Sequence, residues 1–399
     1  MRIKRQQIIN FLFIVTVFLV TRQFPFAFLS PIMNVAVVCL LLLSLAKEKI
    51  GNNEAYLLII LLMFPLTCNF LYSIGIVGNK VLLAVKFYIV LLSIGLAYFV
   101  KVDKFALKWF VILCLLQVLV MLAIAIYIMT FLNINSYLPL RVFFIEKGWG
   151  DIYTFNGYFY RIQIKGSALL VIAFILNLEI KLFSKRYIIT FILLLGIVLA
   201  GNFAFLIALA IYFIYKIISL KTIRSLNGYF LKIITSLFFL SLFFPQIYRY
   251  ISQTIEGKSD NSLSMRWDQV DVLLKSLTEN NLVFLLGRGL GHTLDVITAI
   301  RDYRDGIYFE IQIIYIINQL GVIFFLCFIA YNIFIVILRW GRNSREVYIA
   351  YVVYIVYAVT NPYILDTNHV VVIIVLNSWI YFKKKVNDKQ KSSINHSLI

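Results

Sequence analysis

The chain has 399 residues, of which 62% are hydrophobic and 14% are charged, and its formal net charge is +19. Soluble domains are about half apolar and about a quarter charged, so this composition excludes an ordinary soluble globular protein. Several apolar runs approach the roughly 20 residues that a helix needs to cross a bilayer. The runs are continuous and do not alternate with period two, which excludes a transmembrane β-barrel.

Twelve apolar segments in succession predict an all-α polytopic integral membrane protein, with residues 1–399 forming a single transmembrane domain. We expect transmembrane helices at 8–23, 27–46, 55–75, 80–99, 106–132, 166–183, 187–201, 203–220, 229–248, 308–337, 346–364 and 368–382. The first segment follows a basic N-terminus, as in a signal peptide. No small-x-small cleavage site follows it, so we expect this segment to be retained as a helix.

Basic residues indicate which ends of these helices face the cytoplasm. If the N-terminus is inside, the inside segments hold most of the lysines and the short outside turns hold almost none, as the positive-inside rule requires. The inside set is Arg2, Lys4, Arg5, Lys47, Lys49, Lys101, Lys104, Lys108, Lys181, Lys185, Arg186, Lys216, Lys221, Arg224, Lys232, Arg339, Arg342, Arg345, Lys383, Lys384, Lys385, Lys389 and Lys391. We therefore expect both termini in the cytoplasm, and we interpret the net charge as a topology signal, not a sign of nucleic-acid binding.

Two long segments, 133–165 and 249–307, fall on the outer side. Their basic residues are mainly arginines, and topology gives no reason for positive charge there. The planar guanidinium binds phosphate or carboxylate through two parallel hydrogen bonds, which favours an anionic ligand. Solvated ion pairs with neighbouring acids are the alternative. The arginines are Arg141, Arg161, Arg249, Arg266, Arg288, Arg301 and Arg304.

An amphipathic helix is predicted inside the larger outer loop, from about 265 to 278, with Ser262 or Ser264 as its N-cap. Lying on the membrane surface, it would hold Arg266 at the level of the lipid headgroups. Its apolar residues recur at helical spacing, at Trp267, Val270, Leu274 and Leu277.

A glycine-rich turn, Gly287-Arg288-Gly289-Leu290-Gly291, follows this helix. Its backbone amides could approach an anion, with Arg288 beside them, or the turn could simply join two segments. It is no dinucleotide fingerprint, because no βαβ unit surrounds it. His292 comes next, and a lone histidine is more often structural than catalytic.

Glu310 lies where the chain re-enters the membrane, a costly place for a carboxylate that is neither paired nor functional. It could cap the helix that begins there, or it could act as a base or as an anchor for a sugar hydroxyl. Lys86 lies about two turns inside the fourth helix, where it either extends to the headgroups or meets an anionic ligand. Aromatic residues of the first outer loop could form an interfacial belt or a surface for sugars: Trp149, Tyr153, Phe155, Tyr158, Phe159 and Tyr160.

This arrangement resembles the O-antigen polymerase and ligase superfamily of bacterial inner membranes. The resemblance covers the whole topology and is sharpest at 260–325. It rests on an arginine that opens the loop helix, the glycine-rich turn, a polar residue at the next helix start, and an arginine before the sixth helix. The matching positions are Arg266, Gly287–Gly291, Glu310, Leu320-Gly321-Val322-Ile323 and Arg161. Ligases of the superfamily tend to have histidine where Glu310 stands, which favours a polymerase.

The resemblance implies joining of oligosaccharide units carried on undecaprenyl pyrophosphate at the periplasmic face. A hydroxyl of one lipid-linked unit attacks a second unit, whose pyrophosphate lipid leaves, and no metal or other cofactor is required. Glu310, Arg266 and Arg161 are the catalytic candidates. Candidate substrate-binding residues are Arg288, His292, Arg301, Arg304, Trp149, Tyr160 and Lys86.

Membrane lipid and a chain-length regulator protein are the further partners that the resemblance suggests, and nucleic acid is not among them. A lipid-linked oligosaccharide flippase and an O-antigen ligase are the alternative functions. Flippases are usually built from repeats and carry charges within their helices. This sequence shows no repeat between its halves, and its helices are nearly free of charge.

Overall fold

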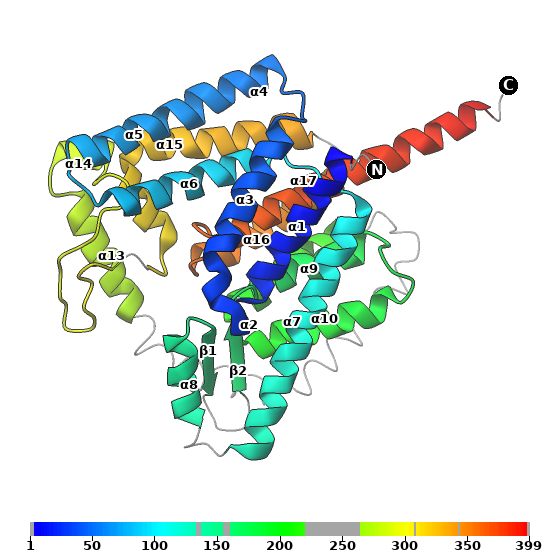
Figure 1. Cartoon of the computed structure of the whole chain (residues 1–399), viewed down its shortest axis with the longest axis horizontal. Coiled ribbons are helices and arrows are strands. Elements are labelled where there is room, and N and C mark those ends of the chain that lie inside the picture. The colour runs from blue at the N-terminus through cyan, green and yellow to red at the C-terminus, as the bar shows by residue number, and fades with distance from the viewer. Residues whose placement is uncertain are drawn as a thin grey trace.

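Helices make up most of the computed structural model, which describes residues 4–132, 137–154, 160–219, 264–306, 309–341 and 344–396 (Figure 1). The first half contains α1 (Arg5–Thr21), α2 (Gln23–Phe26), η1 (Ala27–Leu29), α3 (Ser30–Leu45), α4 (Asn52–Leu57), the π-helical η2 (Leu58–Met63), α5 (Phe64–Gly75), α6 (Val81–Ala97) and α7 (Lys104–Phe131). Then come α8 (Tyr137–Glu146), β1 (Gly150–Thr154), β2 (Tyr160–Ile164), α9 (Leu169–Glu179), α10 (Arg186–Ala200), α11 (Phe203–Ser219), α13 (Ser264–Leu277), α14 (Asn281–Leu286), α15 (Gln312–Trp340), α16 (Arg345–Val359) and α17 (Thr367–His396). Each predicted span coincides with a helix except 229–248, which lies outside the described residues.

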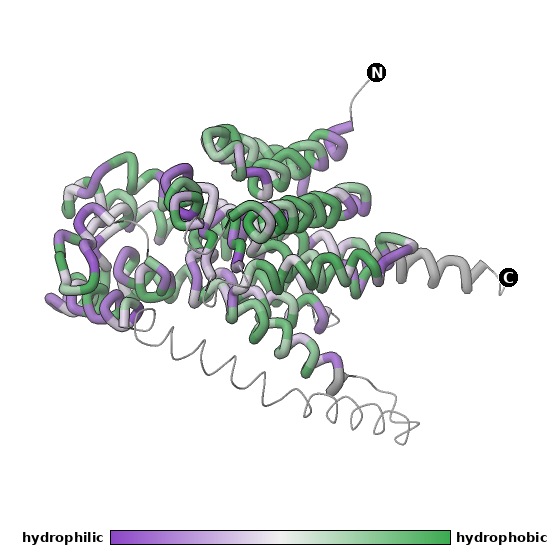
Figure 2. Tube along the Cα trace, turned by 90° about the horizontal axis from the view of Figure 1, so that it is seen from below, coloured by the Kyte–Doolittle hydropathy of each residue, from purple (hydrophilic) through white to green (hydrophobic). Residues whose placement is uncertain are grey.

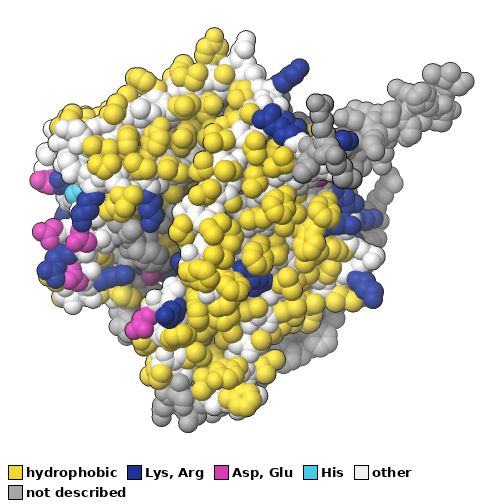
Figure 3. Space-filling view, viewed as in Figure 1, with side chains coloured by type: hydrophobic (Ala, Val, Ile, Leu, Met, Phe, Trp, Pro, Cys, Tyr) yellow, Lys and Arg dark blue, Asp and Glu magenta, His cyan; other side chains and the backbone are white. Residues whose placement is uncertain are grey.

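Among the described residues, four helical stretches are long and apolar enough to cross a membrane: Phe24–Leu45, Asn52–Gly75, Lys104–Phe131 and Gln312–Trp340. Five shorter helices in this part of the chain are also apolar. The outward faces carry large hydrophobic side chains, with Leu82 81% and Phe131 76% exposed. Such continuous apolar surface is unfavourable in water and matches lipid (Figure 3). Figure 2 shows hydrophobic residues along the helices and hydrophilic stretches gathered toward their ends.

The centre of the bundle is formed by α9 and the first half of α17. Residues 169–176 of α9 are at most 2% exposed on every side of the helix, and so are residues 370–376 of α17. A helix that is apolar all round is stable only when other helices or lipid surround it. Here α7, α10 and α16 pack around α9.

A two-stranded antiparallel hairpin, β1–β2, occupies part of the segment 133–165 that was predicted as the first outer loop, with Gly150 opposite Ile164 and Thr154 opposite Tyr160. The all-α prediction omitted it, because two strands of five residues among aromatics have no strong period-two signal. Ile152, Ile162 and Ile164 are buried beneath it. Period-two alternation therefore places Arg161 and Gln163 on the opposite face of β2.

Helix α15 begins at Gln312, not at 308 as predicted, and it breaks at Gly321. Gly321 has φ +67° and ψ 172°, a conformation that is essentially restricted to glycine. The backbone of Gly287 lies against this break, and a Cβ on Gly287 would come within 2.6 Å of the Leu320 carbonyl carbon. The glycine-rich turn at 287–291 and the segment 320–323, about 30 residues apart in the sequence, therefore pack directly against each other.

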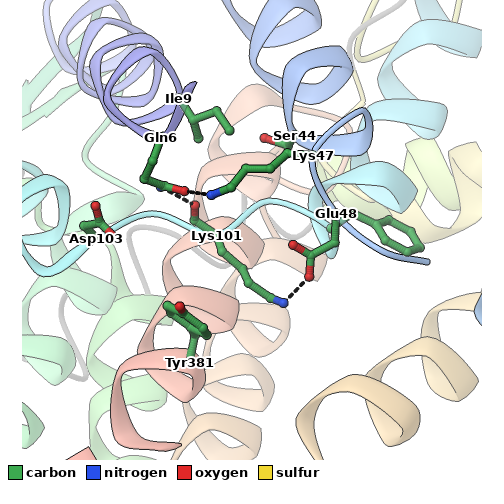
Figure 4. A pocket seen from close by; sticks show the side chains of 9 residues that line it. Gln6, Ile9, Ser44, Lys47, Glu48, Lys101, Asp103 and Tyr381 are labelled. Carbon is green, nitrogen blue, oxygen red and sulfur yellow. Dashed lines mark hydrogen bonds and ion pairs between the residues drawn. The ribbon is translucent and has the colours of Figure 1, made fainter. Parts of the chain in front are cut away.

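Ion pairs tie the helix ends together at the end of the bundle where α1 starts and α17 finishes (Figure 1). A cavity of about 240 Å³ lies among them, and the side chains around it pair with one another: Lys101 with Glu48, and Lys47 with Gln6 (Figure 4). Beside it, the Arg339 side chain is only 6% exposed and donates to Glu54 over 3.0 Å. This network is at the opposite end of the molecule from the hairpin and α13.

Candidate functional site

Four segments that lie far apart in the sequence are joined at the end of the bundle that carries the hairpin. They are β2, the start of α13, the entry to α15 at 309–312, and the loop 360–366 between α16 and α17. We call this set of residues the outer cluster. It comprises Arg161, Gln163, Arg266, Glu310, Gln312, Tyr363 and Asp366.

Arg161 is placed by β2 and by the turn between α10 and α11. Gly201 in that turn has φ +57°, and a Cβ there would lie 2.7 Å from Cγ of Arg161. Only glycine leaves room for the aliphatic part of the arginine and also adopts this left-handed conformation readily. The boundary between the predicted spans 187–201 and 203–220 is therefore a tight turn, and this turn seats Arg161.

The guanidinium of Arg161 is incompletely hydrogen-bonded. Its Nη2 donates to Gln163, but its Nε is buried and has no hydrogen-bond partner among the described residues. Burial lowers the pKa of Arg161, while the neighbouring Asp151, Tyr363 and Glu310 oppose that shift. A buried donor without an acceptor costs about 1–3 kcal/mol, so an anionic ligand that accepted this hydrogen bond would bind favourably.

The loop 360–366 is attached to β2 and to the turn after α10. Gln163 donates to the hydroxyl of Tyr363 over 2.5 Å, and Asn202 donates to Asn361 over 2.9 Å. From α16, the Tyr354 hydroxyl donates to the Tyr363 carbonyl over 2.6 Å. These bonds fix the loop directly beside Arg161.

Arg266 and Glu310 form the second half of the outer cluster. Arg266 Nε lies 3.0 Å from a Glu310 carboxylate oxygen, with the two side chains 36% and 32% exposed. The Glu310 amide donates to Gln269 of α13 over 2.9 Å. Two residues on, Gln312 accepts from the Leu365 amide over 2.7 Å, which joins this half to the loop 360–366. Glu310 therefore precedes α15 and binds an arginine instead of capping the helix.

Asp366 ends the loop 360–366, and its carboxylate forms no ion pair within the described part of the chain. Asn368 donates to it over 2.5 Å. Burial raises the pKa of Asp366, whereas this amide and the nearby Lys165 lower it. The outer cluster therefore contains two carboxylates in different states: Glu310 bound to an arginine, and Asp366 without a cationic partner.

Arg288, predicted to bind an anion, is already paired within the protein. Its Nε donates to the Ser276 carbonyl over 3.0 Å, and its guanidinium forms an ion pair with Glu279. The structure therefore places it against α13 and not in the outer cluster.

Backbone amides of the glycine-rich turn also donate their hydrogen bonds within the protein. Arg288 N donates to the Asn318 carbonyl, Leu290 N to the Ser73 hydroxyl, and Gly291 N to the Gln319 side chain. Because these donors are taken, the turn is a packing element that holds α14 against α5 and α15. The interpretation of this turn as an anion cradle is wrong for these amides.

His292 lies next to this turn, and its carbonyl accepts from Gln319 over 2.9 Å. Burial, and secondarily Arg288, lowers the pKa of His292 to about 4, so the imidazole is neutral near pH 7. No hydrogen bond or ion pair of the described residues links it to the outer cluster.

The other predicted binding residues lie apart from the outer cluster. Arg304 pairs with Asp302 over 2.7 Å on an exposed loop, and Arg301 lies over the ring of Tyr303 at 5.9 Å. Lys86 is exposed on α6, and none of the acidic residues that the structure describes pairs with it. These three cations therefore remain unconnected to Arg161.

Trp149 and Tyr160 are packing residues of the first outer loop. The Trp149 ring lies 4.8 Å from Phe24 and 5.2 Å from Phe143, edge to face in both cases. Tyr160 is 5% exposed and packs on Tyr137 at 5.5 Å. These contacts hold α2, α8 and the hairpin together and leave little free ring surface for a sugar.

Helix α13 forms as predicted, with bounds close to 265–278, but a different face is buried. Its inward residues are Gln269, Val272, Leu273 and Leu277. Trp267 is 65% and Leu274 42% exposed, so both point away from the protein. That outward pair is what a helix lying against the membrane surface would present.

Sequence reasoning missed the contribution of the loop 360–366. Its residues Asn361, Tyr363 and Asp366 lie in a turn so short that it looked like a simple connection between two helices. The signal that could have found them was a carboxylate close to the start of an apolar helix, the same argument that singled out Glu310.

Comparisons of this chain with protein-family models, with curated proteins and with solved structures find no match. The functional argument therefore depends on the geometry of the outer cluster, which offers one under-bonded cation, one arginine held by a carboxylate and one carboxylate without a cationic partner.

Proposed function

We propose that this protein is a membrane-embedded glycosyltransferase of the O-antigen polymerase type. It would cross the inner membrane of a bacterium twelve times, with both termini in the cytoplasm and the outer cluster at the periplasmic face. Its substrates would be oligosaccharide repeat units carried on undecaprenyl pyrophosphate, and its product a longer chain on one lipid.

The observation that carries this proposal is the unpaired Nε of the buried Arg161, in the same cluster as the Arg266–Glu310 pair. A departing pyrophosphate accumulates negative charge, and cations held in place before the reaction stabilise it most effectively. Arg161 supplies a donor that needs an acceptor. Arg266, a third exposed, can exchange part of its contact with Glu310 for a phosphate oxygen, since such exposed pairs contribute only about 0–1 kcal/mol.

The location of the cluster also supports surface chemistry over transport. Transporters place substrate sites near the middle of the membrane, between broken helices. The outer cluster is instead built from a hairpin, a helix entry and an interhelical loop at one end of the bundle (Figure 1). A lipid-linked sugar chain could reach it from the outer surface while its isoprenoid stays in the bilayer.

The direct test reconstitutes the purified protein in liposomes with a defined lipid-pyrophosphate-linked repeat unit. The expected result is a ladder of longer chains and release of undecaprenyl pyrophosphate. Arg266→Ala should abolish long chains while the protein remains in the membrane. Lys275→Ala, on the same helix but in an exposed pair with Asp271, is the matched control and should retain the ladder.

Two results would contradict the proposal: no chain extension by the wild-type protein, or a normal ladder from Arg266→Ala. In cells, loss of the protein should leave lipopolysaccharide capped with a single unit. Absence of any exported unit would instead indicate a flippase, and absence of any capped core would indicate a ligase.

A further inference from the structure

Asp366 is the carboxylate of the outer cluster that the proposed function has not used. It lies between Lys165 at the end of β2 and the start of α17, and its loop is fixed on both sides. Gln163 holds Tyr363 from the Arg161 side, and Gln312 holds Leu365 from the Glu310 side. Asp366 is thus bracketed by the two halves of the cluster.

Glu310 and Asp366 differ in what their oxygens already bind. Glu310 accepts from Arg266, and this bond occupies the side of the carboxylate that faces the cation. Asp366 accepts from the side-chain amide of Asn368 and from the backbone amides of Thr367 and Asn368, all of which are neutral donors. A carboxylate that lacks a cationic partner and is partly desolvated takes up a proton more readily.

Unsatisfied polar atoms beside Asp366 indicate that a polar ligand belongs there. Asn368 is 4% exposed, and its Oδ1 is buried without a hydrogen-bond partner among the described residues. Across Tyr363, which lies near both Asp366 and Arg161, Nε of Arg161 is also unpartnered among the described residues. A sugar offers hydroxyls that donate and accept, and phosphate oxygens offer acceptors, so a glycosyl pyrophosphate with a second sugar satisfies both kinds of atom.

We propose that the loop 360–368 is the acceptor-sugar side of the site, and that Asp366 accepts the proton of the attacking hydroxyl while Glu310 positions Arg266. This inference rests on the proposed function and replaces the sequence-based choice of Glu310 as the base. It assigns the ligand class as a carbohydrate with a free hydroxyl, held by the amide oxygen of Asn368.

The proposed glycosyl transfer is a single displacement, in which one bond forms and one bond breaks at the anomeric carbon. The acceptor oxygen forms a bond to the anomeric carbon of the donor sugar, and the bond from that carbon to the pyrophosphate oxygen breaks. The electron pair of that bond stays on the pyrophosphate, facing Arg161 and Arg266. The hydroxyl proton moves to the Asp366 carboxylate and then to water at the outer surface.

Asp366→Asn tests this assignment in the reconstituted system, because the amide keeps the shape and cannot take up the proton. General-base catalysis contributes about 10²–10⁴-fold, so kcat should fall by about 100-fold or more. The KM for the lipid-linked donor should change by no more than about threefold, since the arginines are intact. Asp366→Glu should recover part of the rate. Asp305→Asn, an exposed outer carboxylate paired with Lys80, is the control and should be unaffected.

The pH profile separates a proton acceptor from a structural residue. The groups that face Asp366 are Lys165 from the end of β2, Tyr354 from α16 and Tyr363 from its own loop. The wild-type rate should fall as pH decreases through the pKa of Asp366, because the carboxylate form is required. The residual rate of Asp366→Asn should lack this acidic limb.

The possible results distinguish failure of the proposed function from failure of the Asp366 assignment alone. If the wild-type protein extends no chains, the proposed function fails and takes this inference with it. If the wild-type protein is active and Asp366→Asn keeps at least about half of its rate, or keeps the acidic limb, the inference alone fails. Loss of donor binding together with activity in Asp366→Asn would also overturn it, because the residue would then be structural.

Discussion

Replacement of Arg161 should separate activity from stability. Its Nε is buried without an acceptor, and burial already opposes its charge. Arg161→Ala removes this unsatisfied donor and leaves a space beside Gly201. The lost packing destabilises the protein, whereas removal of a buried, unsatisfied donor stabilises it. The two effects offset each other, so the free energy of unfolding should change by no more than about 1 kcal/mol.

The same change should be costly for the reaction. Loss of one positioned donor to a developing negative charge lowers kcat by about 10²–10³-fold, or about 3 kcal/mol of transition-state stabilisation. Arg161→Lys keeps the charge and loses the planar fork, so it should recover only part of the rate. A protein that is inactive and as stable as the wild type is characteristic of a residue retained for function.

The assay is chain extension in liposomes, measured with the unfolding temperature of the same samples. Arg304→Ala removes an exposed outer arginine that binds Asp302 and should change neither quantity. The reasoning fails if Arg161→Ala extends chains at a rate within about twofold of the wild type, or if it loses several kcal/mol of stability. The second result would make Arg161 a structural residue of the hairpin.

Three further predictions concern the scaffold. Gly321→Ala should destabilise the protein by about 1–3 kcal/mol or prevent its accumulation in the membrane, because φ +67° with ψ 172° strains any other residue. As the control, Gly51→Ala should be neutral in the same thermal assay, because Gly51 has φ −69° and open space around it. Arg339→Met should lower the free energy of unfolding by about 3 kcal/mol, because it leaves Glu54 without its cation. Replacement of the exposed Arg345 by Met should lower it little. Equal losses of stability in the two variants would contradict the role of the ion-pair network around Arg339. His292, with its pKa lowered from 6.5 to about 4, favours the folded state in its neutral form, so its contribution is complete above about pH 6.5 and is lost as pH falls toward 4. His292→Gln should flatten that part of the stability profile, and an unchanged slope would refute the assignment.

The helices could be predicted because their signal is local. Each apolar run records the length of a helix in lipid, so the prediction of 106–132 lies close to the observed Lys104–Phe131. The entry to α15 was placed four residues too early for the same reason. Near the start of the run, Phe309 is apolar but lies outside the helix, and it stacks on Tyr303.

The outer cluster was predictable only in part. Arg161, Arg266 and Glu310 could be found because charge on the outer side has no role in topology. Gln163 and Tyr363 could not, because their significance arises from a contact between residues 200 positions apart. A β-strand of five residues places Gln163 beside the loop 360–366, and no periodicity in either segment predicts that contact.

The glycine motif and the outer cluster are connected through the break in α15. Arg288 and Gly287 pack against the Asn318–Gly321 segment, and this contact fixes where the first half of α15 ends. That half begins at Gln312, which binds the loop 360–366, and just before it stands Glu310 with Arg266. The glycine-rich turn, whose own amides bind within the protein, can therefore still determine the position of Arg266, for which we propose anion binding. On this argument, substitutions in the turn 287–291 should weaken activity in proportion to the stability they remove. Substitutions of Arg161 or Asp366 should lower activity by about 100-fold or more without a comparable loss of stability.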